Sequence, residues 1–311
     1  MKTARRVGWR WPAGGSPATV GAWLDFAESL YTKHKLALGQ VSGSAHDEAL
    51  YLLLRTLGLP LESDARVLDR RLTAAEAAKV EAVFRRRVEE RVPAAYLTQE
   101  AWLGPFSFYV DERVIIPRSY FLEIIPGQLA DWLPRHGAEV KRVADICTGS
   151  GCLAILLAKQ FRAARVDATD LSPAALEVAA INVRRHRLGP RVHLFPGDLL
   201  AALPAAAKYD VILSNPPYEP SALVDDQAPE FAAEPRMAHD GGRDGLGLIR
   251  KLLRQAGPRL QPHGLVVLEV GGLRPAIDRE FAALEPHWLA TEDGSDCICL
   301  FHAARLAGTV T

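Results

Sequence analysis

The sequence predicts an α/β protein in which a mostly parallel sheet, covered by helices, follows a small helical domain. Two observations in the 311 residues lead to this class. From about residue 140 onward, apolar runs typical of strands alternate with helical periodicity, which indicates a parallel sheet with helices on both faces. Before residue 90, apolar residues recur at helical spacing alone. We therefore expect a helical domain over residues 1–92, a β-hairpin linker over 93–118 and a sheet domain over 119–311.

Three helices account for the expected first domain. The first helix is marked by apolar residues at roughly helical spacing, Leu24, Phe26, Leu30 and Tyr31, and the second ends at Gly58. The third begins at a capping box, in which the side chains of Thr73 and Glu76 each satisfy the backbone N–H of the other. A domain this small buries a limited core, so we expect it to lean on the rest of the chain.

The linker is predicted from a change of pattern after Pro93. Trp102, Phe106 and Phe108 lie in short β-type runs, and a turn around Gly104 separates these runs. This pattern is typical of a hairpin between two domains.

The sheet domain contains seven strand-like runs, at 142–147, 165–169, 191–195, 210–214, 264–270, 288–291 and 297–302. Helical patterns lie between them, at 151–160, 172–186, 246–256 and 275–284. We expect the last two strands to pair as an antiparallel ribbon. The stretch 219–245 is the longest without a regular pattern, and its length indicates a functional loop.

The composition excludes several classes of function. The formal net charge is zero, so the overall charge does not favour nucleic acid. The cysteines lack zinc-ribbon and thioredoxin spacing, which predicts reduced thiols in a cytosolic protein. The histidines show no metal-ligand spacing, and no apolar stretch has the length of a membrane span. Met1–Arg10 is basic without an apolar core, so we expect a loose tail or an arm that contacts RNA, and no secretory signal.

Three loops at expected strand ends carry groups suited to a nucleoside with a charged tail. Gly149 and Gly151 allow close approach of the backbone to a ligand, and Asp145 before them is suited to a cationic amine. Asp170 ends the next strand and suits ribose hydroxyls, while Asp198 suits an adenine amino group. Turn and helix-cap geometry explain each loop on its own. Together, they indicate a ligand laid across the carboxyl edge of one sheet.

The tetrapeptide Asn215-Pro216-Pro217-Tyr218 follows an expected strand. Neither proline can donate to a sheet ladder, so the strand ends there. The Asn215 side-chain oxygen and the Pro216 carbonyl can accept the two N–H bonds of a planar NH₂ group and stabilise positive charge on its nitrogen, and Tyr218 can stack on the group. With a methyl donor in line at about 3–3.5 Å, positioning supplies most of the rate. A rigid Pro-Pro turn is the structural alternative.

These motifs resemble, in their order along the chain, those of the class I S-adenosylmethionine-dependent methyltransferases that modify amide or amino nitrogens. More narrowly, the chain resembles the glutamine N(5)-methyltransferases of the translation apparatus. Three further stretches carry this narrower resemblance, at 95–98, 110–119 and 234–246. The resemblance covers almost the whole chain after about residue 20.

The resemblance implies a Rossmann-like, seven-stranded, mostly parallel sheet, S-adenosylmethionine as the cofactor and no metal. It implies that the helical domain recognises a protein substrate and that 219–245 is a candidate lid. The residues implied to bind the cofactor are Asp145, Thr148, Gly149, Gly151, Asp170, Leu171, Asp198 and Asn215. Those implied to bind the substrate are Asn215, Pro216, Pro217, Tyr218 and Arg118, of which Asn215, Pro216 and Tyr218 have catalytic roles.

Two substrates fit this family: a glutamine of large-subunit ribosomal protein L3 and the Gly-Gly-Gln glutamine of peptide release factors. The segment Pro117-Arg118-Ser119 is similar to the ribosomal-protein branch, whereas release-factor enzymes carry Pro-Arg-Pro-Glu-Thr-Glu there. Tyr120–Phe121 and Arg236–His239 depart from the pattern of that branch. We expect a cytoplasmic monomer that methylates a ribosomal protein and contacts ribosomal RNA through its basic N-terminal residues.

Two alternatives come from other classes. A DNA adenine N(6)-methyltransferase acts on the same planar NH₂ group but should carry a basic DNA-binding face. This chain is neutral, and its 219–245 loop is acidic. The other alternative is a non-catalytic ribosome-assembly factor that binds the cofactor alone, against which the intact tetrapeptide argues.

Overall fold

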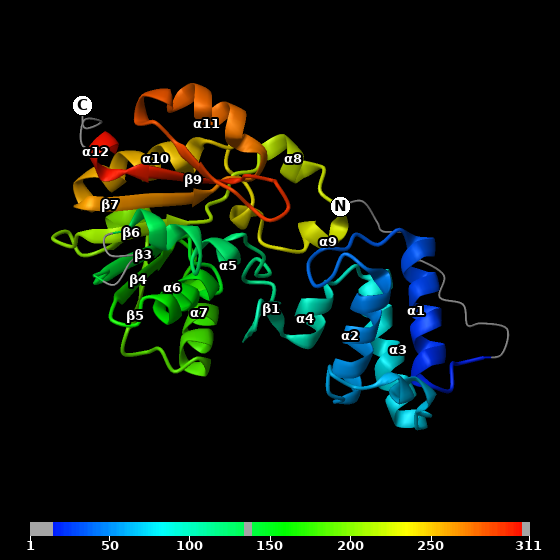
Figure 1. The fold of residues 1–311 in the computed structure, drawn as a ribbon. Coiled ribbons are helices and arrows are strands. Elements are labelled where there is room, and N and C mark those ends of the chain that lie inside the picture. The colour runs from blue at the N-terminus through cyan, green and yellow to red at the C-terminus, as the bar shows by residue number, and fades with distance from the viewer. Residues whose placement is uncertain (1–14, 134–138, 307–311) are drawn as a thin grey trace. The chain divides into compact units, whose positions relative to one another are not determined.

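Figure 1 shows the fold of the chain, for which a computed structural model describes residues 15–133 and 139–306. The chain divides into two compact units. Of the described residues, those up to 101 together with 228–233 form the first unit, and those from 102 to 227 and from 234 onward form the second. The basic segment Met1–Arg10, considered above as an RNA-binding arm, lies outside the described residues.

The first unit is helical, as the sequence predicts. Its elements are α1 (Val20–His34), α2 (Ala45–Leu57), η1 (Ala65–Asp69), α3 (Ala74–Glu89) and α4 (Ala94–Thr98). The predicted capping box at the start of α3 is confirmed, because Thr73 and Glu76 make both reciprocal hydrogen bonds. Gly58 ends α2 in the left-handed conformation that glycine adopts readily. Trp23, Leu52 and Phe84 are fully buried between these helices.

A buried cluster of charged side chains holds the segment 228–233 in this unit. Its helix α9 (Pro229–Ala232) carries Glu230, which is fully buried. Arg91 Nη1 lies 2.8 Å from Glu230 Oε1, and Arg87 Nη1 lies 3.6 Å from the same oxygen. Arg87 is itself fully buried and donates from Nε to Glu48 Oε1 at 2.7 Å. Buried charges require such pairing. The sequence did not reveal that a piece of the 219–245 loop belongs to the helical unit.

The second unit is built on a seven-stranded sheet with the order β5-β4-β3-β6-β7-β9-β8. The strands are β3 (Arg142–Ile146), β4 (Arg165–Asp170), β5 (Val192–Pro196), β6 (Tyr209–Ser214), β7 (Leu260–Glu269), β8 (His287–Leu289) and β9 (Ile298–His302). All neighbours are parallel except β9, which is antiparallel to both β7 and β8. The predicted fold class and the predicted terminal ribbon are therefore confirmed.

The strand order reverses between β3 and β6. The strands β4 and β5 lie on one side of β3, whereas β6 and β7 lie on the other. In open α/β sheets, ligands bind outside the carboxyl ends of the strands at such a reversal. The fold therefore places the loops after β3 and β6 at its natural binding crevice.

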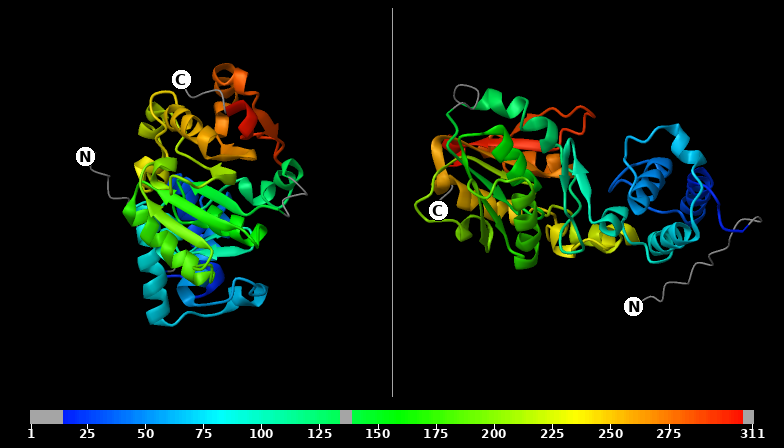
Figure 2. Two further views of the ribbon diagram at one scale, coloured as in Figure 1. Left: turned by 90° about the vertical axis from the view of Figure 1, so that its left-hand side faces the viewer. Right: turned by 90° about the horizontal axis from the view of Figure 1, so that it is seen from below.

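Helices cover both faces of this sheet (Figures 1 and 2). On one face, α6 (Cys152–Gln160) and α7 (Pro173–Arg185) pack with α5 (Phe121–Ile124). On the other face lie α10 (Gly247–Ala256), α11 (Arg274–Glu280) and α12 (Ala303–Leu306). Successive strand residues point to opposite faces, so Val143 joins the first core and Ala144 the second. Both cores bury apolar side chains from the central strands, which fixes the position of the strand ends.

The hairpin between the two domains consists of β1 (Ala101–Leu103) and β2 (Phe106–Phe108), and is shorter than the linker expected over 93–118. The 219–245 loop contains the short helices α8 (Ser221–Asp225), α9 and η5 (Arg236–Ala238), so it is more regular than its sequence indicates. Among the residues that the structure describes, no helix is long and apolar enough to cross a membrane.

The buried charge cluster predicts a stability effect. Replacing Arg87 by Met should lower the free energy of unfolding by about 3–5 kcal/mol, because the Glu48 and Glu230 carboxylates would stay buried without this partner. Urea unfolding measures the change. The matched control is Arg66→Met, which removes an exposed pair with Asp64 and should leave the stability unchanged within error. Equal effects of the two substitutions would contradict the assigned role of the cluster.

Candidate active site

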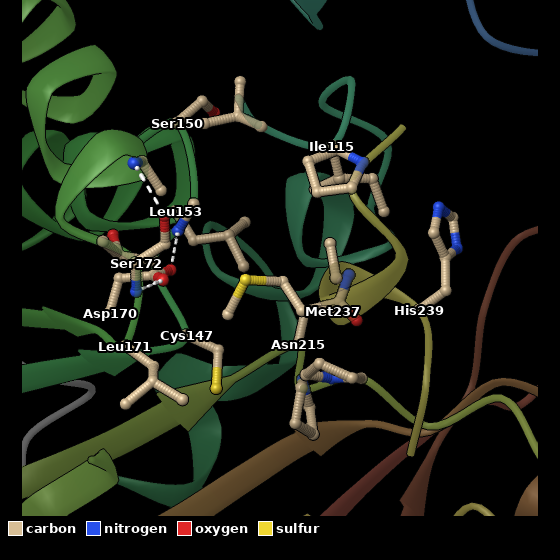
Figure 3. A pocket seen from close by; sticks show the side chains of 18 of the residues that line it. Ile115, Cys147, Ser150, Leu153, Asp170, Leu171, Ser172, Asn215, Met237 and His239 are labelled. Atoms are coloured by element: carbon tan, nitrogen blue, oxygen red, sulfur yellow. Dashed lines mark hydrogen bonds between the residues drawn. The ribbon is translucent and has the colours of Figure 1, made fainter. Parts of the chain in front are cut away.

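A cavity of about 500 Å³ opens at the carboxyl edge of the sheet, at the reversal of strand order. Its walls come from the loops after β3, β4, β5, β6 and β7, from residues 113–120 and from 235–239. All of these segments belong to the second unit. Figure 3 shows Asp170 and Leu171 toward one end of the cavity, His239 toward the other, and Asn215 and Met237 between them. Most of the residues predicted from the sequence as ligand-binding meet here.

The loop after β3 forms a turn with room for a ligand. Gly149 lines the cavity with a φ of +54°, and a Cβ added to it would meet only Ile115 Cγ2, at 3.9 Å. Gly151 has a different role, because an added Cβ would lie 3.1 Å from Ala179 Cβ of α7. Gly151 therefore allows α7 to pack against the turn, and it is not among the lining residues.

Asp145 lies beneath this turn and not in the cavity wall. Its side chain is fully buried, and Oδ2 accepts a hydrogen bond from Thr148 Oγ1 at 2.6 Å. Burial raises the pKa of Asp145 to about 7, although the bond from Thr148 opposes the shift. The other carboxyl oxygen, Oδ1, is buried and has no partner among the described residues. Thr148, which lines the cavity, is thus the member of the pair that faces it, and Asp145 supports Thr148 from beneath.

Asp170 joins the ends of two strands. Its Oδ2 accepts from the backbone N–H of Gly149 at 2.8 Å, and its Oδ1 accepts from Ser172 N at 2.9 Å (Figure 3). Burial raises the pKa of the Asp170 carboxyl, and these backbone bonds oppose the shift. Leu171 follows it in the wall with 63% of its surface exposed. Asp170 therefore fixes the glycine turn and also faces the cavity.

Asp198 follows β5 and lines the cavity, where it forms an ion pair with Lys251 of α10. Both side chains are partly exposed. Sequence analysis missed Lys251, because a single lysine on a helix carries no distinctive signal. This pair holds the loop after β5 against α10.

The tetrapeptide Asn215-Pro216-Pro217-Tyr218 leaves β6 at the centre of the cavity, and all four residues line it. Gly271 seats the Tyr218 ring: its φ is +51°, and an added Cβ would lie 2.5 Å from Tyr218 Cε2. A Cβ added to Gly241 or to Gly245 of the loop would collide with the backbone of Tyr218. Burial raises the pKa of Tyr218 well above its usual value, so the phenol is neutral at physiological pH. The tetrapeptide is therefore confined by glycines on two other segments.

Arg118 and Glu234 attach the 219–245 loop to the segment after the hairpin. Arg118 Nη1 and Nη2 donate to the two carboxylate oxygens of Glu234 at 2.7 and 2.6 Å, and Ile116 N donates to Oε1 at 3.2 Å. His239 Nε2 lies 2.8 Å from Glu234 Oε2. Burial favours the neutral form of Glu234, but the bonds from Arg118 and His239 lower its pKa below the usual value. Arg118, predicted to bind substrate, lines the cavity and also has this structural role.

Sequence reasoning missed several residues of the wall. Glu269 ends β7 in the wall, and Ser119 Oγ donates a hydrogen bond to its carboxylate. The signal for Glu269 was weak, because a glutamate at the end of an apolar strand is a common pattern, whereas Ser119 had been noted only as part of the Pro117-Arg118-Ser119 segment. Among the residues that the structure describes, no group of three His, Cys, Asp or Glu side chains is arranged to hold a metal ion.

Comparison with known proteins agrees with this geometry. A family model described as "Methyltransferase small domain" matches residues 128–243. The chain is 44% identical over 294 residues to the ribosomal protein uL3 glutamine methyltransferase of Burkholderia pseudomallei, covering 93% of this chain and 95% of that protein. The protein of the same name from Bordetella pertussis is 46% identical over 288 residues, with coverage of 93% and 96%. That of Neisseria meningitidis serogroup B is 42% identical over 290 residues, with coverage of 93% and 95%.

The packing of the Tyr218 ring against Gly271 can be tested with substitutions at two adjacent glycines. Gly271→Ala should lower the free energy of unfolding by about 1–3 kcal/mol, since its Cβ collides with the ring at a positive φ. Gly272→Ala is the matched control, because nothing lies within 4 Å of an added Cβ there. Chemical denaturation of both variants measures the difference. A Gly271→Ala protein as stable as the control would show that the ring does not occupy this seat.

Proposed function

The chain belongs to the ribosomal protein uL3 glutamine methyltransferases, and from this membership we propose that it methylates the side-chain amide nitrogen of a glutamine in ribosomal protein uL3. The methyl donor is S-adenosylmethionine. The observation that carries the proposal is the meeting of the Asn215–Tyr218 tetrapeptide with the glycine turn and Asp170 in one cavity. The tetrapeptide suits a planar NH₂ group, and the glycine turn with Asp170 suits a nucleoside with a charged tail.

The cavity fits the cofactor on two observations. The backbone at Gly149 has open space in front of it, as a closely approaching ligand requires. The buried Oδ1 of Asp145 has no protein partner in the described chain, which leaves an acceptor at the base of this turn. The residues that would hold the cofactor in the wall are Thr148, Gly149, Asp170, Leu171 and Asp198. S-adenosylmethionine, when bound, supplies an electrophilic methyl group on a positively charged sulfur.

The tetrapeptide addresses the low reactivity of the acceptor. An amide nitrogen is a poor nucleophile because its lone pair is delocalised into the carbonyl group. In our proposal, Asn215 Oδ1 and the Pro216 carbonyl oxygen accept its two N–H bonds and stabilise the positive charge that develops on nitrogen. Tyr218, held against Gly271, packs on the planar amide and fixes its orientation. The proton leaves after the new C–N bond forms, so no base has to act first.

The substrate, its recognition and the cellular location are also part of the proposed function. The names of the relatives favour a ribosomal protein over a release factor as the substrate, and zero net charge disfavours DNA. We propose that the helical unit recognises uL3, that Arg118 with its partner Glu234 orders the acceptor side, and that the enzyme works as a cytoplasmic monomer without metal. On sequence alone, we also assign contact with ribosomal RNA to the basic residues Met1–Arg10.

Identification of the substrate tests the proposal. The enzyme is incubated with labelled S-adenosylmethionine and, separately, with uL3, a peptide release factor and duplex DNA, and the label is mapped by mass spectrometry. We expect label on a uL3 glutamine and more than tenfold less on the other two. Label on DNA alone would overturn the glutamine assignment, and label on the release factor alone would reassign the protein substrate.

The role of the tetrapeptide is tested by three substitutions. Asn215→Ala should lower kcat at least 100-fold and leave cofactor affinity within a few-fold, because it removes an acceptor that acts on the transition state. Tyr218→Ala should also lower kcat, whereas Tyr218→Phe, which keeps the ring, should stay near wild type. Calorimetry with S-adenosylhomocysteine measures the affinity. Collapse of cofactor binding in Asn215→Ala would contradict the division of roles along this edge.

A further inference from the structure

Glu269 and Asn215 lie side by side at the ends of neighbouring strands. β6 and β7 are parallel, and the last paired residues are Ser214 and Leu268. Asn215 and Glu269 occupy the next position along each strand, and both line the cavity. Because parallel neighbours stand about 4.8 Å apart, the two side chains are within reach of each other. The Asn215 amide is in fact one of the groups that interact with the Glu269 carboxyl.

The Glu269 carboxyl group is buried, which disfavours its ionised form. Only 4% of its surface is exposed, and burial raises its pKa to about 7. Donors around it oppose that shift: the Ser119 hydroxyl, the backbone at Tyr120, the charge of Arg118 and the Asn215 amide. The guanidinium of Arg118 makes a two-pronged bond to Glu234. Burying a carboxylate costs free energy unless hydrogen bonds compensate. A functional role would explain why Glu269 stands in the cavity wall.

The chemistry of the Asn215 amide indicates the role of Glu269. Its oxygen and nitrogen ends have almost the same shape, so packing alone does not decide which end faces the substrate. The proposed reaction needs the oxygen there, since a second NH₂ group would repel the N–H bonds of a glutamine. An ionised carboxylate only accepts hydrogen bonds, so it selects the NH₂ end of its neighbour.

We propose that Glu269 is a positioning residue: its carboxylate accepts from Asn215 Nδ2 and thereby turns Asn215 Oδ1 toward the acceptor amide. Ser119 supports this by donating to Oε2 of the same carboxylate. The inference rests on the proposed function and adds the group that sets the orientation of its central acceptor. It also gives Ser119, in the Pro117-Arg118-Ser119 segment, a physical role.

Protonation of Glu269 should make kcat depend on pH. Above its pKa the Glu269 carboxyl only accepts, whereas below it the protonated form can donate to Asn215 Oδ1 and so turn the amide the wrong way. The group's pKa is raised to about 7, so kcat should fall as the pH drops through neutrality. In the described chain, the titratable and charged groups that interact electrostatically with Glu269 are Arg118, Tyr218, Cys152 and Cys297. The pKa values of Tyr218 and both thiols are raised, so none of these groups titrates between pH 6 and about 8.

Glu269→Gln tests the inference. Its amide can donate or accept and so does not select the Asn215 orientation. We expect kcat for uL3 to fall at least tenfold, with KM and the affinity for S-adenosylhomocysteine within threefold of wild type, and the fall in kcat below neutral pH to disappear. Ser119→Ala should keep that fall but move its midpoint to higher pH, because it removes a bond that lowers the pKa of Glu269.

Asp145→Asn is the comparison for the pH profile, since burial also raises the pKa of Asp145 to about 7. The Asp145→Asn variant should retain the fall in kcat below neutral pH. If the fall in kcat below neutral pH vanishes in Asp145→Asn and persists in Glu269→Gln, the inference is overturned. If the wild type methylates uL3 while Glu269→Gln keeps the wild-type kcat and pH profile, positioning by Glu269 fails and the proposed function stands. If the wild type does not methylate uL3, the proposed function itself fails.

A readout without substrate or cofactor separates orientation from activity. The chain has two asparagines, Asn182 and Asn215, so ¹⁵N-asparagine labelling gives two side-chain NH₂ signals. Asn182 is fully buried and bonded to Tyr109 and Ser150, and serves as an internal reference. The Asn215 signal should shift with a midpoint near pH 7 in wild type and not in Glu269→Gln. A pH-independent Asn215 signal in wild type would contradict the contact.

Discussion

Two prolines directly after β6 impose the constraint on which the site depends. Neither can donate a backbone hydrogen bond, so the central strand ends at Ser214 and releases Asn215 at the carboxyl edge. The strand order reverses between β3 and β6, so this release occurs where the sheet opens its crevice. The two apolar cores hold β6 from both faces. The Asn215 side chain and the Pro216 carbonyl group are therefore placed by a fully buried strand, which gives them the precision that the proposed methyl transfer requires.

Carboxylates inside the second unit hold the surrounding loops to that edge. Asp170 fixes the glycine turn through Gly149, and Glu234 fixes the 219–245 loop through Arg118. Glu269 is anchored by Ser119 beside the tetrapeptide. A buried carboxylate is stabilised only where donors meet it, so each one determines the position of the segment that donates. The cavity wall is thus specified by polar pairs, while the sheet beneath it is specified by apolar packing.

Much of this could be predicted from the sequence. Periodicity alone was enough for the helical unit and the parallel sheet, and the strand-ending tetrapeptide was predicted to form the acceptor side before any geometry was known. The loops after β3, β4 and β5 were predicted to form the cofactor side, and the structure brings them to one cavity, with Asp145 beneath its wall and Gly151 behind it. Residues such as Glu230, Lys251 and Glu269 were not predictable, because their roles come from partners distant in the chain. A lone charged residue in a sequence does not reveal such partners.

The central claim is that Asn215 and Pro216 grip the amide nitrogen of a uL3 glutamine. The most direct measurement is a crystal structure of the enzyme with S-adenosylhomocysteine and a uL3 peptide that contains the glutamine. The account predicts the glutamine nitrogen within about 3 Å of both Asn215 Oδ1 and the Pro216 carbonyl oxygen, with the Asn215 NH₂ group toward Glu269. A glutamine amide bound away from the tetrapeptide, or an Asn215 whose nitrogen faces the substrate, would contradict it.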